Sequence, residues 1–385
     1  MDLEVHQLDV KTAYLNGILD EEIYLEPAEG FKPTDGTVWK LNKSLYGLKQ
    51  AGRVWYKRIR AEIESLGFTA CVSDPCLFHK LEGDKLTLVA VYVDDMVLAS
   101  TSLADLEEVK NLFKKSFNIT DLGDINWILG IHVERDRTKR SISLSQERYV
   151  EEVLSRFGQQ DAHPMVTPML ANQRLVRTEK PEVDIRTYQR ILGSVMWAML
   201  GTRPDLAFTI GSLSQFSSAP TEEALHALMR MLRYLCRTSD TRLVYRGTQK
   251  EELTGFVDAD WAGNVNDRRS ISGFVFKVAD GAISWSSKKQ GSTALSSTKA
   301  EYVAGTHAAK ELVWLWALFA EISLPCKGPT TLFMDNQSAM AIAENPVYHA
   351  RTKHIGARHH FLRERVEDGE LELKYLPTGD QMADV

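Results

Sequence analysis

The chain has 385 residues, of which 44% are hydrophobic and 25% charged, as in ordinary globular proteins long enough for two or three domains. Its longest apolar runs, ILGSVMWAML and LVWLWALFA, are too short to cross a bilayer, and the N-terminal stretch lacks the features of a signal peptide. We therefore expect no membrane partner. The net charge of −6 argues weakly against nucleic acid, and four cysteines without metal-ligand spacing indicate free thiols.

The N-terminal part predicts a mixture of helices and strands. Residues 50–66 and 103–117 have helical spacing, and residues 85–100 predict two strands. Residues 186–236 predict helices that are interrupted at TRPD, 202–205. Soft boundaries near 163–170 and 237–253 divide the chain into the expected regions 1–165, 166–250 and 251–385.

The last region has a clearer pattern of strands and helices. The predicted order is three strands, a long helix, a strand, a short helix, a basic helical stretch, a strand and the start of a final helix, at residues 253–262, 270–279, 281–288, 296–322, 330–336, 337–344, 351–365, 369–377 and 379–385. This order is typical of an α/β layer fold.

Two adjacent aspartates, Asp94 and Asp95, interrupt the apolar stretch VAVYVDDMVLAS. Two carboxylates about 4 Å apart repel by roughly 4 kcal/mol at a protein-surface dielectric. A polar hairpin tip would explain them, but Asp-Asp is a poor two-residue turn. The residues alone leave both interpretations open.

Four further acids occur in the last region. Each could be a helix cap, a turn residue or a solvated side chain, but their order suggests convergence above a sheet: Asp258, Glu301, Asp335 and Asp384. Converging carboxylates need cations, and two Mg²⁺ ions would neutralise them and activate water at a phosphodiester.

Two windows are basic in this acidic chain. Residues 36–61 contain no acid, and their Lys and Arg side chains alternate with aromatic rings. The second window is RTKHIGARHHFLRER, residues 351–365. Cations and flat rings are typical of a nucleic-acid groove, although a solvated helix face would also explain either window. The histidines of the second window lack a cysteine pair, which disfavours zinc.

The last region resembles the ribonuclease H domain of copia-type LTR retrotransposons. The resemblance rests on several motifs spread over about 130 residues: TGFVDADWAG, RRSISGFVF, ISWSSKKQ, SSTKAEYVA, FMDNQSA, RTKHIGARHHFLRERV and YLPTGDQMAD. It implies that Asp258, Glu301, Asp335 and Asp384 bind the metal ions. We also expect basic residues of these motifs to contact nucleic acid, namely Lys288, Lys289, Arg351, Lys353 and His354.

The first region resembles the reverse transcriptase of the same elements, through HQLDVKTAYLNG, SLYGLKQAGRVWY and VYVDDMVLAS. The resemblance implies a right-hand polymerase palm in which Asp9, Asp94 and Asp95 hold two Mg²⁺ or Mn²⁺ ions, with Asp94 and Asp95 at a hairpin tip facing Asp9. It implies that Tyr14 lies under the sugar, and that basic and polar side chains grip the nucleotide or template, namely Lys49, Gln50 and Arg53. Residues 191–216 resemble the connection between polymerase and nuclease.

The expected fold is therefore a multidomain α/β and α+β chain: palm, thumb with connection, then a ribonuclease-H-like mixed sheet with flanking helices. The implied partners are RNA template, DNA primer, RNA/DNA hybrid and deoxynucleoside triphosphates, with integrase and capsid as other polyprotein parts. The family works in cytoplasmic particles and in the nucleus.

The chain also departs from the family pattern. A fingers segment is expected before Asp9, and Gly52, Lys299 and Gly356 differ from the usual residues of relatives. We expect a partial polyprotein whose ribonuclease site is more nearly complete than its polymerase site. Two alternatives stay open: a ribonuclease H on an inactive palm, and a catalytically silent remnant that binds nucleic acid.

Overall fold

The computed structural model describes residues 2–31, 37–171, 173–247, 252–344 and 360–383. It is a mixed α/β structure that divides into two compact units. The first unit holds residues 1–125 and 316–325, and the second holds residues 126–315 and 326–385. No helix in the described ranges is both long enough and apolar enough to cross a membrane.

The first unit contains an antiparallel six-stranded sheet. In spatial order its strands are β4 (Thr69–Ala70), β5 (Leu77–Glu82), β6 (Lys85–Tyr92), β7 (Asp95–Ser100), β1 (Glu4–Val10) and β8 (Ile119–Asp124). The prediction of two strands within residues 85–100 is confirmed. The strand that begins the chain, β1, lies between β7 and β8, so that its side chains are largely buried.

Helices α1 (Ala51–Ser65) and α2 (Leu103–Ser116) cover this sheet, and both were predicted. Helix α1 buries every fourth residue, namely Ala51, Trp55, Ile59 and Ile63. Trp55 is 2% exposed, which makes it a core residue and overturns its assignment to the stacking rings of the basic window. Helix α2 begins at the N-cap Ser102, whose side chain accepts a hydrogen bond from the Asp105 backbone N–H.

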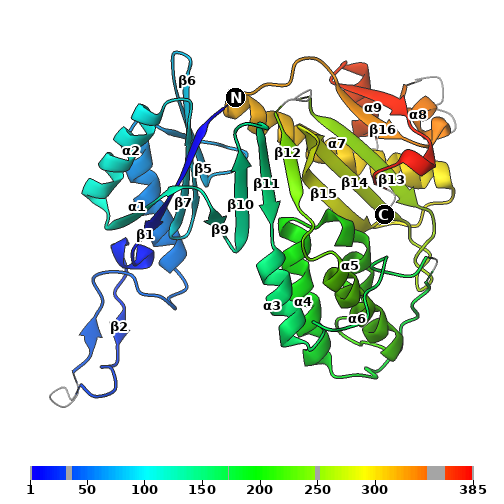
Figure 1. Ribbon diagram of the computed structural model, residues 1–385, viewed down its shortest axis with the longest axis horizontal. Coiled ribbons are helices and arrows are strands. Elements are labelled where there is room, and N and C mark those ends of the chain that lie inside the picture. Colours follow the sequence, from blue (N-terminus) through cyan, green and yellow to red (C-terminus); the bar gives the residue numbers. More distant parts are fainter. Residues whose placement is uncertain (1, 32–36, 172, 248–251, 345–359, 384–385) are drawn as a thin grey trace. The chain divides into compact units, whose positions relative to one another are not determined.

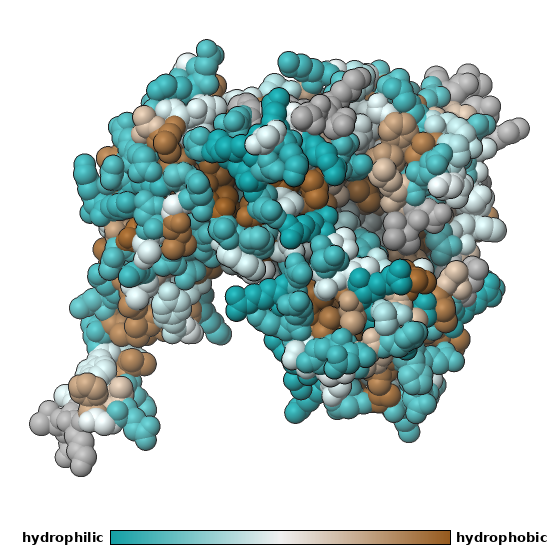
Figure 2. Space-filling view, viewed as in Figure 1, coloured by the Kyte–Doolittle hydropathy of each residue, from teal (hydrophilic) through white to brown (hydrophobic). Residues whose placement is uncertain are grey.

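A long arm leaves the first unit between the short helix η1 (Ala13–Asn16) and α1. It carries the two-stranded sheet of β2 (Tyr24–Leu25) and β3 (Trp39–Lys40). Hydrophobic side chains are exposed along this arm, as Figure 2 shows. They include Tyr24, Leu25, Phe31, Val38 and Trp39.

The second unit begins with an antiparallel sheet in the order β12 (Leu243–Arg246), β11 (Ser141–Ser145), β10 (Ile131–Asp136) and β9 (Trp127–Ile128). Four helices follow β11 and pack on one another: α3 (Glu147–Arg156), α4 (Ile185–Gly201), α5 (Ala207–Ser214) and α6 (Glu222–Arg237). Figure 1 shows them as a bundle. The core that they share is apolar.

The break predicted at TRPD is confirmed, because α4 ends at Gly201 and the short helix η2 (Pro204–Leu206) separates it from α5. Arg203 at this break is 1% exposed. Its guanidinium donates to both carboxylate oxygens of Asp205, at 2.9 and 2.7 Å, and to Thr238. This bidentate pair satisfies a charge that would be costly to bury alone.

The five-stranded sheet of the second unit has the order β15 (Gly281–Lys289), β14 (Ile271–Val278), β13 (Thr254–Asp260), β16 (Thr330–Met334) and β17 (Leu371–Tyr375). The first three strands are antiparallel neighbours, whereas β16 and β17 are parallel to β13. Three helices accompany them: α7 (Ser297–Glu321), α8 (Gln337–Glu344) and α9 (His360–Glu367).

The strands and helices predicted for this region are confirmed except in two segments late in the chain, the basic helical stretch and the final helix. The basic stretch 351–365 lies outside the described residues up to residue 359, and α9 begins at His360. The expected final helix is wrong for residues 379–383, where only the short helix η5 (Thr378–Asp380) forms. Gln381 is extended after it, because its side chain bonds to the sheet.

Candidate active sites

Three of the four acids expected in the last region lie together. Carboxylate oxygens of Asp258, Glu301 and Asp335 all lie within 4.8 Å of one another. We call these three residues the carboxylate cluster. Glu301 is 5% exposed, and the two aspartates are half-buried. An all-oxygen, triply acidic site suits a hard divalent cation such as Mg²⁺, so the donor set fits the metal implied by the sequence.

The register of two parallel strands brings the aspartates together. Phe256 of β13 is paired with Phe333 of β16, and Asp258 and Asp335 each lie two residues further along. The carboxyl ends of neighbouring parallel strands meet at one edge of the sheet, where the two side chains become neighbours. Glu301 joins them from the first turns of α7, whose preceding Ser296 accepts a hydrogen bond from the Lys299 N–H.

The segment that follows β17 closes this edge. Thr378 donates a hydrogen bond of 2.6 Å to Oδ2 of Asp335. Gln381 is buried, and its amide donates to the carbonyl oxygen of Val257 at 3.0 Å and to that of Phe333 at 3.4 Å. Gln381 therefore holds together the two strands that carry the aspartates, a role that the sequence analysis missed.

A glycine lets this segment approach β14. Gly273 is paired with Asp258 in the sheet, and a Cβ at Gly273 would lie only 2.8 Å from the carbonyl oxygen of Ala383. Ala383 thus lies next to the strand pair that carries Asp258. The expected fourth acid, Asp384, lies outside the described residues.

The hairpin aspartates Asp94 and Asp95 occupy different backbone positions. Tyr92 pairs with Asp95, so the two-residue turn consists of Val93 and Asp94 rather than of both aspartates. Val93 has a φ of 55°, which is strained for a β-branched residue. The Trp55 indole donates to the Val93 carbonyl at 2.6 Å, and the Val10 N–H donates to the Asp94 carbonyl at 2.8 Å. These two bonds hold the strained turn.

Asp9 and Asp95 are direct partners in the register of β1 and β7, so their side chains lie on one face of the sheet. Burial raises the pKa of Asp95, and the charges of Asp94 and Asp9 add to this shift. Gln7 opposes the shift by donating a hydrogen bond of 2.9 Å to Oδ1 of Asp95. Gln7 is buried on the same strand as Asp9 and was missed by the sequence analysis.

The three acids of the first unit are less tightly gathered than the carboxylate cluster. The structure describes Asp9, Asp94 and Asp95, but the carboxylate oxygens of these three residues do not all lie within 4.8 Å of one another. Oxygen donors around a sheet face still fit a hard divalent cation chemically. Such a cation would reduce the repulsion between these carboxylates.

The side chains expected to contact the nucleotide belong to η1, to the residues just before α1 and to the first turn of α1. The rings of Tyr14 and Tyr46 have centroids 4.6 Å apart. Gln50 donates a hydrogen bond of 3.0 Å to Glu21, whereas Lys49 and Arg53 are exposed. Four exposed cations of the basic window have no ion-pair partner in the part of the chain that the structure describes: Lys43, Lys49, Arg53 and Lys57.

The expected basic residues of the second unit differ in their surroundings. Lys288 is exposed, whereas Lys289 forms an ion pair of 2.7 Å with Asp267. Burial alone would raise the pKa of Asp267, but hydrogen bonds from Lys289 and from the Arg269 backbone N–H outweigh it and lower the pKa. Arg351, Lys353 and His354 lie outside the described residues.

A second group of possible metal ligands lies in the first unit and was not predicted. It consists of Glu4, His6 and Asp124. His6 lies 3.0 Å from Asp124 and also contacts the buried ammonium group of Lys110, which forms an ion pair with Asp121 at 3.1 Å. Lys110 already supplies the positive charge here, so this group is an ion-pair network between β1, α2 and β8.

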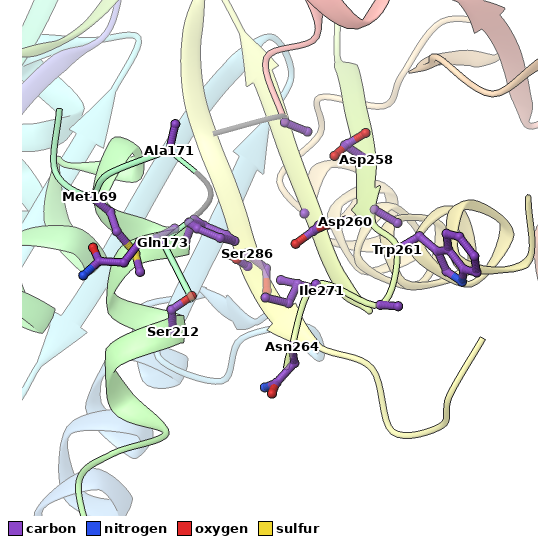
Figure 3. Close-up of a pocket in the computed structure, with 18 of the residues that line it drawn as sticks. Met169, Ala171, Gln173, Ser212, Asp258, Asp260, Trp261, Asn264, Ile271 and Ser286 are labelled. Atoms are coloured by element: carbon purple, nitrogen blue, oxygen red, sulfur yellow. The ribbon is translucent and has the colours of Figure 1, made fainter. Parts of the chain in front are cut away.

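A cavity of about 900 Å³ adjoins the carboxylate cluster within the second unit. Asp258 and Asp260 line one part of it, and Met169, Gln173 and Ser212 line another (Figure 3). The cavity therefore connects the acidic edge of the sheet with the helices that precede the sheet in the chain. Sequence patterns within either segment carry no signal for this contact.

Comparison with known proteins relates both units to one group. The family model described as "Reverse transcriptase (RNA-dependent DNA polymerase)" matches residues 1–171. The retrovirus-related Pol polyprotein from transposon TNT 1-94 of Nicotiana tabacum is 41% identical over 100% of this chain and 30% of that polyprotein. The chain thus spans less than a third of this relative.

A putative transposon Ty5-1 protein of Saccharomyces cerevisiae is 31% identical, over 79% of this chain and 100% of that protein. Among solved structures, RNase H1 from Halobacterium salinarum is matched over 33% of this chain and 87% of that chain, with 16% identity and a TM-score of 0.22. That score is too low to establish a shared fold.

Proposed function

This chain belongs to the reverse transcriptase family of copia-type retrotransposon Pol polyproteins, and from this premise we propose that it is an RNA-directed DNA polymerase with ribonuclease H activity on RNA/DNA hybrids. Residues 1–165 would form the palm, 166–250 the thumb and connection, and 251–385 the ribonuclease H domain. The proposal rests on the carboxylate cluster, because three acids from three separate segments of the fold have carboxylate oxygens within 4.8 Å of one another.

In the ribonuclease, Asp258, Glu301 and Asp335 would hold Mg²⁺, with Asp384 as a fourth ligand. When bound, two such ions activate water and stabilise the leaving oxygen of a phosphodiester. Thr378 keeps one oxygen of Asp335 in a fixed direction through its 2.6 Å hydrogen bond. Gln381 keeps the spacing of the two aspartate-bearing strands. RNA/DNA hybrid is the substrate that this proposal requires.

In the polymerase, Asp9, Asp94 and Asp95 would hold Mg²⁺ beside a primer end and a deoxynucleoside triphosphate. Gln7 orients Asp95, and Tyr14 would lie under the sugar. The unpaired cations Lys49 and Arg53 would bind phosphate, since neither has an acidic partner among the described residues. The RNA template and the DNA primer are the remaining partners of this reaction, and integrase and capsid are the other polyprotein parts.

A specific observation favours a second candidate, a ribonuclease H on an inactive palm. The acids of the first unit are not gathered as the carboxylate cluster is. If bound substrate and cations do not draw them together, only the nuclease would act. A silent remnant that binds nucleic acid would have neither activity.

One experiment separates these candidates. A labelled RNA template annealed to a shorter DNA primer is incubated with the protein, Mg²⁺ and deoxynucleotides, and primer extension and RNA cleavage are scored together. We expect both products. Cleavage without extension would support the inactive palm, and a folded protein that forms neither product would contradict both enzymatic proposals.

A further inference from the structure

The carboxylate cluster depends on the position of Glu301, which comes from a helix rather than from the sheet. The cap at Ser296 orders the first turn of α7 by accepting a hydrogen bond from the Lys299 N–H. This bond joins α7 to the residue that precedes it and does not attach the turn to the sheet. The distance between Glu301 and Asp258 therefore depends on contacts that join the start of α7 to the strands.

Gln290 makes such a contact. It directly follows β15 and is 1% exposed. Its backbone N–H donates to the Ser270 carbonyl at 2.9 Å. Its side-chain nitrogen donates two hydrogen bonds of 2.9 Å each, one to the carbonyl oxygen of Ala300 in α7 and one to Oγ of Ser272 in β14. One buried side chain therefore connects the first turn of α7 with the sheet.

The two ends of this connection lie beside two members of the carboxylate cluster. Ala300 directly precedes Glu301 in α7. Ser272 is paired in the sheet with the residue that directly follows Asp258. The side chain of Gln290 thereby sets the distance between the backbone at the helical acid and the backbone at the strand acid.

Hydrogen-bond chemistry fixes the orientation of this amide. A carbonyl oxygen only accepts hydrogen bonds, so the nitrogen of Gln290, and not its oxygen, must face Ala300. Oε1 of Gln290 is buried and has no hydrogen-bond partner among the residues that the structure describes. An unsatisfied buried acceptor costs free energy, and an apolar side chain of similar volume would avoid this cost. Stability alone therefore does not explain an amide at this position.

We propose that Gln290 is the positioning residue for Glu301. It holds the start of α7 against β14, so that the carboxylate of Glu301 lies within reach of the same divalent cation as Asp258 and Asp335. The inference rests on the proposed ribonuclease function and adds to it a residue that touches neither substrate nor cation. A metal site must be held to within about 0.5 Å, so release of this one connection is enough to weaken it.

The test measures Mg²⁺ affinity as well as cleavage. Calorimetric titration with Mg²⁺ is carried out in the Asp9→Asn/Asp95→Asn background, so that the heat reports the carboxylate cluster. Gln290→Met keeps the approximate volume of the side chain and removes both donated hydrogen bonds. Cleavage of a labelled RNA/DNA hybrid is measured against Mg²⁺ concentration for the same variants.

Gln146→Met is the matched control. This side chain is also 1% exposed and makes two hydrogen bonds, to the Trp197 carbonyl and from the Thr202 hydroxyl, but it belongs to the helical bundle. A milder variant is Ser272→Ala, which removes one of the two bonds of Gln290 and leaves the bond to α7. Thermal unfolding of each variant is recorded.

For Gln290→Met we expect about a tenfold higher Kd for Mg²⁺ and about a tenfold higher Mg²⁺ concentration at half-maximal cleavage. The KM for the hybrid at saturating Mg²⁺ should not change. Ser272→Ala should fall between Gln290→Met and the parent, and Gln146→Met should resemble the parent even where it is equally destabilised.

Three results would overturn the inference: an unchanged Mg²⁺ affinity in Gln290→Met, equal losses in Gln290→Met and Gln146→Met, or a parent that binds no Mg²⁺ in this titration. If Gln290→Met does not fold, Ser272→Ala decides. A Kd for Mg²⁺ above that of the parent supports the inference, and an unchanged Kd contradicts it.

Failure of this inference is distinguishable from failure of the proposed function. If the parent protein cleaves no RNA but Gln290→Met still loses Mg²⁺ affinity, the ribonuclease proposal fails and the positioning role stands. If the parent cleaves RNA and Gln290→Met binds Mg²⁺ as the parent does, the reverse conclusion holds.

Discussion

The two groups of acids in this chain are built on different backbones. In the carboxylate cluster, Asp258 and Asp335 follow paired positions of two parallel strands, and Glu301 reaches them from α7. In the first unit, Asp9 and Asp95 face each other across antiparallel strands, but Asp94 belongs to a turn. Parallel strand ends gather side chains through register alone, whereas neighbours in a hairpin diverge because successive side chains alternate in direction.

The first test of whether the two groups of acids act separately is the change Asp335→Asn. Mutation of a residue that only supports a metal ligand typically lowers metal affinity or activity by about 10–100-fold. We therefore expect loss of a ligand itself to reduce RNA cleavage by more than about 100-fold. Primer extension should be unchanged. Single-turnover cleavage of a labelled hybrid measures the effect, and Asp280→Asn, at an exposed turn of the same sheet, is the matched control.

The second change is Asp95→Asn, for which we expect the opposite pattern of lost and retained activity. Primer extension should fall by more than about 100-fold, with RNA cleavage retained, because Asp95 lies opposite Asp9 in the first unit. Primer-extension gels measure it, with Asp84→Asn in the neighbouring turn as control. A variant that loses both activities would break the comparison, since it would mean that the two sites are not independent.

The third prediction concerns pH and the first unit alone. Burial alone would raise the pKa of Asp121, but hydrogen bonds from Lys114, the Gly123 N–H and Lys110 lower it to about 2. A depressed carboxylate pKa stabilises the fold above the unfolded value near 3.8, and this contribution is lost as pH falls from 3.8 towards 2.

We therefore expect Asp121→Asn to lower the free energy of opening of β1 and β8 by up to ~2 kcal/mol at pH 6, with a difference that shrinks below pH 4. Hydrogen exchange of peptides from these strands measures it, and the exposed Asp84→Asn serves again as control. A difference that is constant with pH would show that the loss is one of packing, independent of charge.

The smallest expected effects come from the two glutamines that support the acids. Gln7→Met should reduce primer extension about tenfold, because it removes the bond to Asp95 while keeping the volume. Gln381→Met should reduce RNA cleavage about tenfold by releasing Val257 and Phe333. Measured in one assay, each serves as the control of the other. Equal effects on both activities would indicate general destabilisation instead.

The sequence by itself determined the order of elements and the positions of the acids. Hydrophobic periodicity predicted α1, α2 and α7, and the break at TRPD was correct because proline cannot continue a helix. The aspartates were recognisable since carboxylates within or directly after apolar strands are unusual. These are local properties, which depend on neighbours within a few residues.

Only the tertiary structure decided which side chains meet. Trp55 lies in a basic aromatic window but is a core residue that supports Val93. Lys110 is a charged residue of α2, yet it is 2% exposed and forms an ion pair with Asp121 of β8. The hydrogen bond from Gln381 to Val257, and the cavity that Gln173 and Asp258 both line, join residues more than 80 positions apart. Such contacts depend on register and packing, which no local pattern contains.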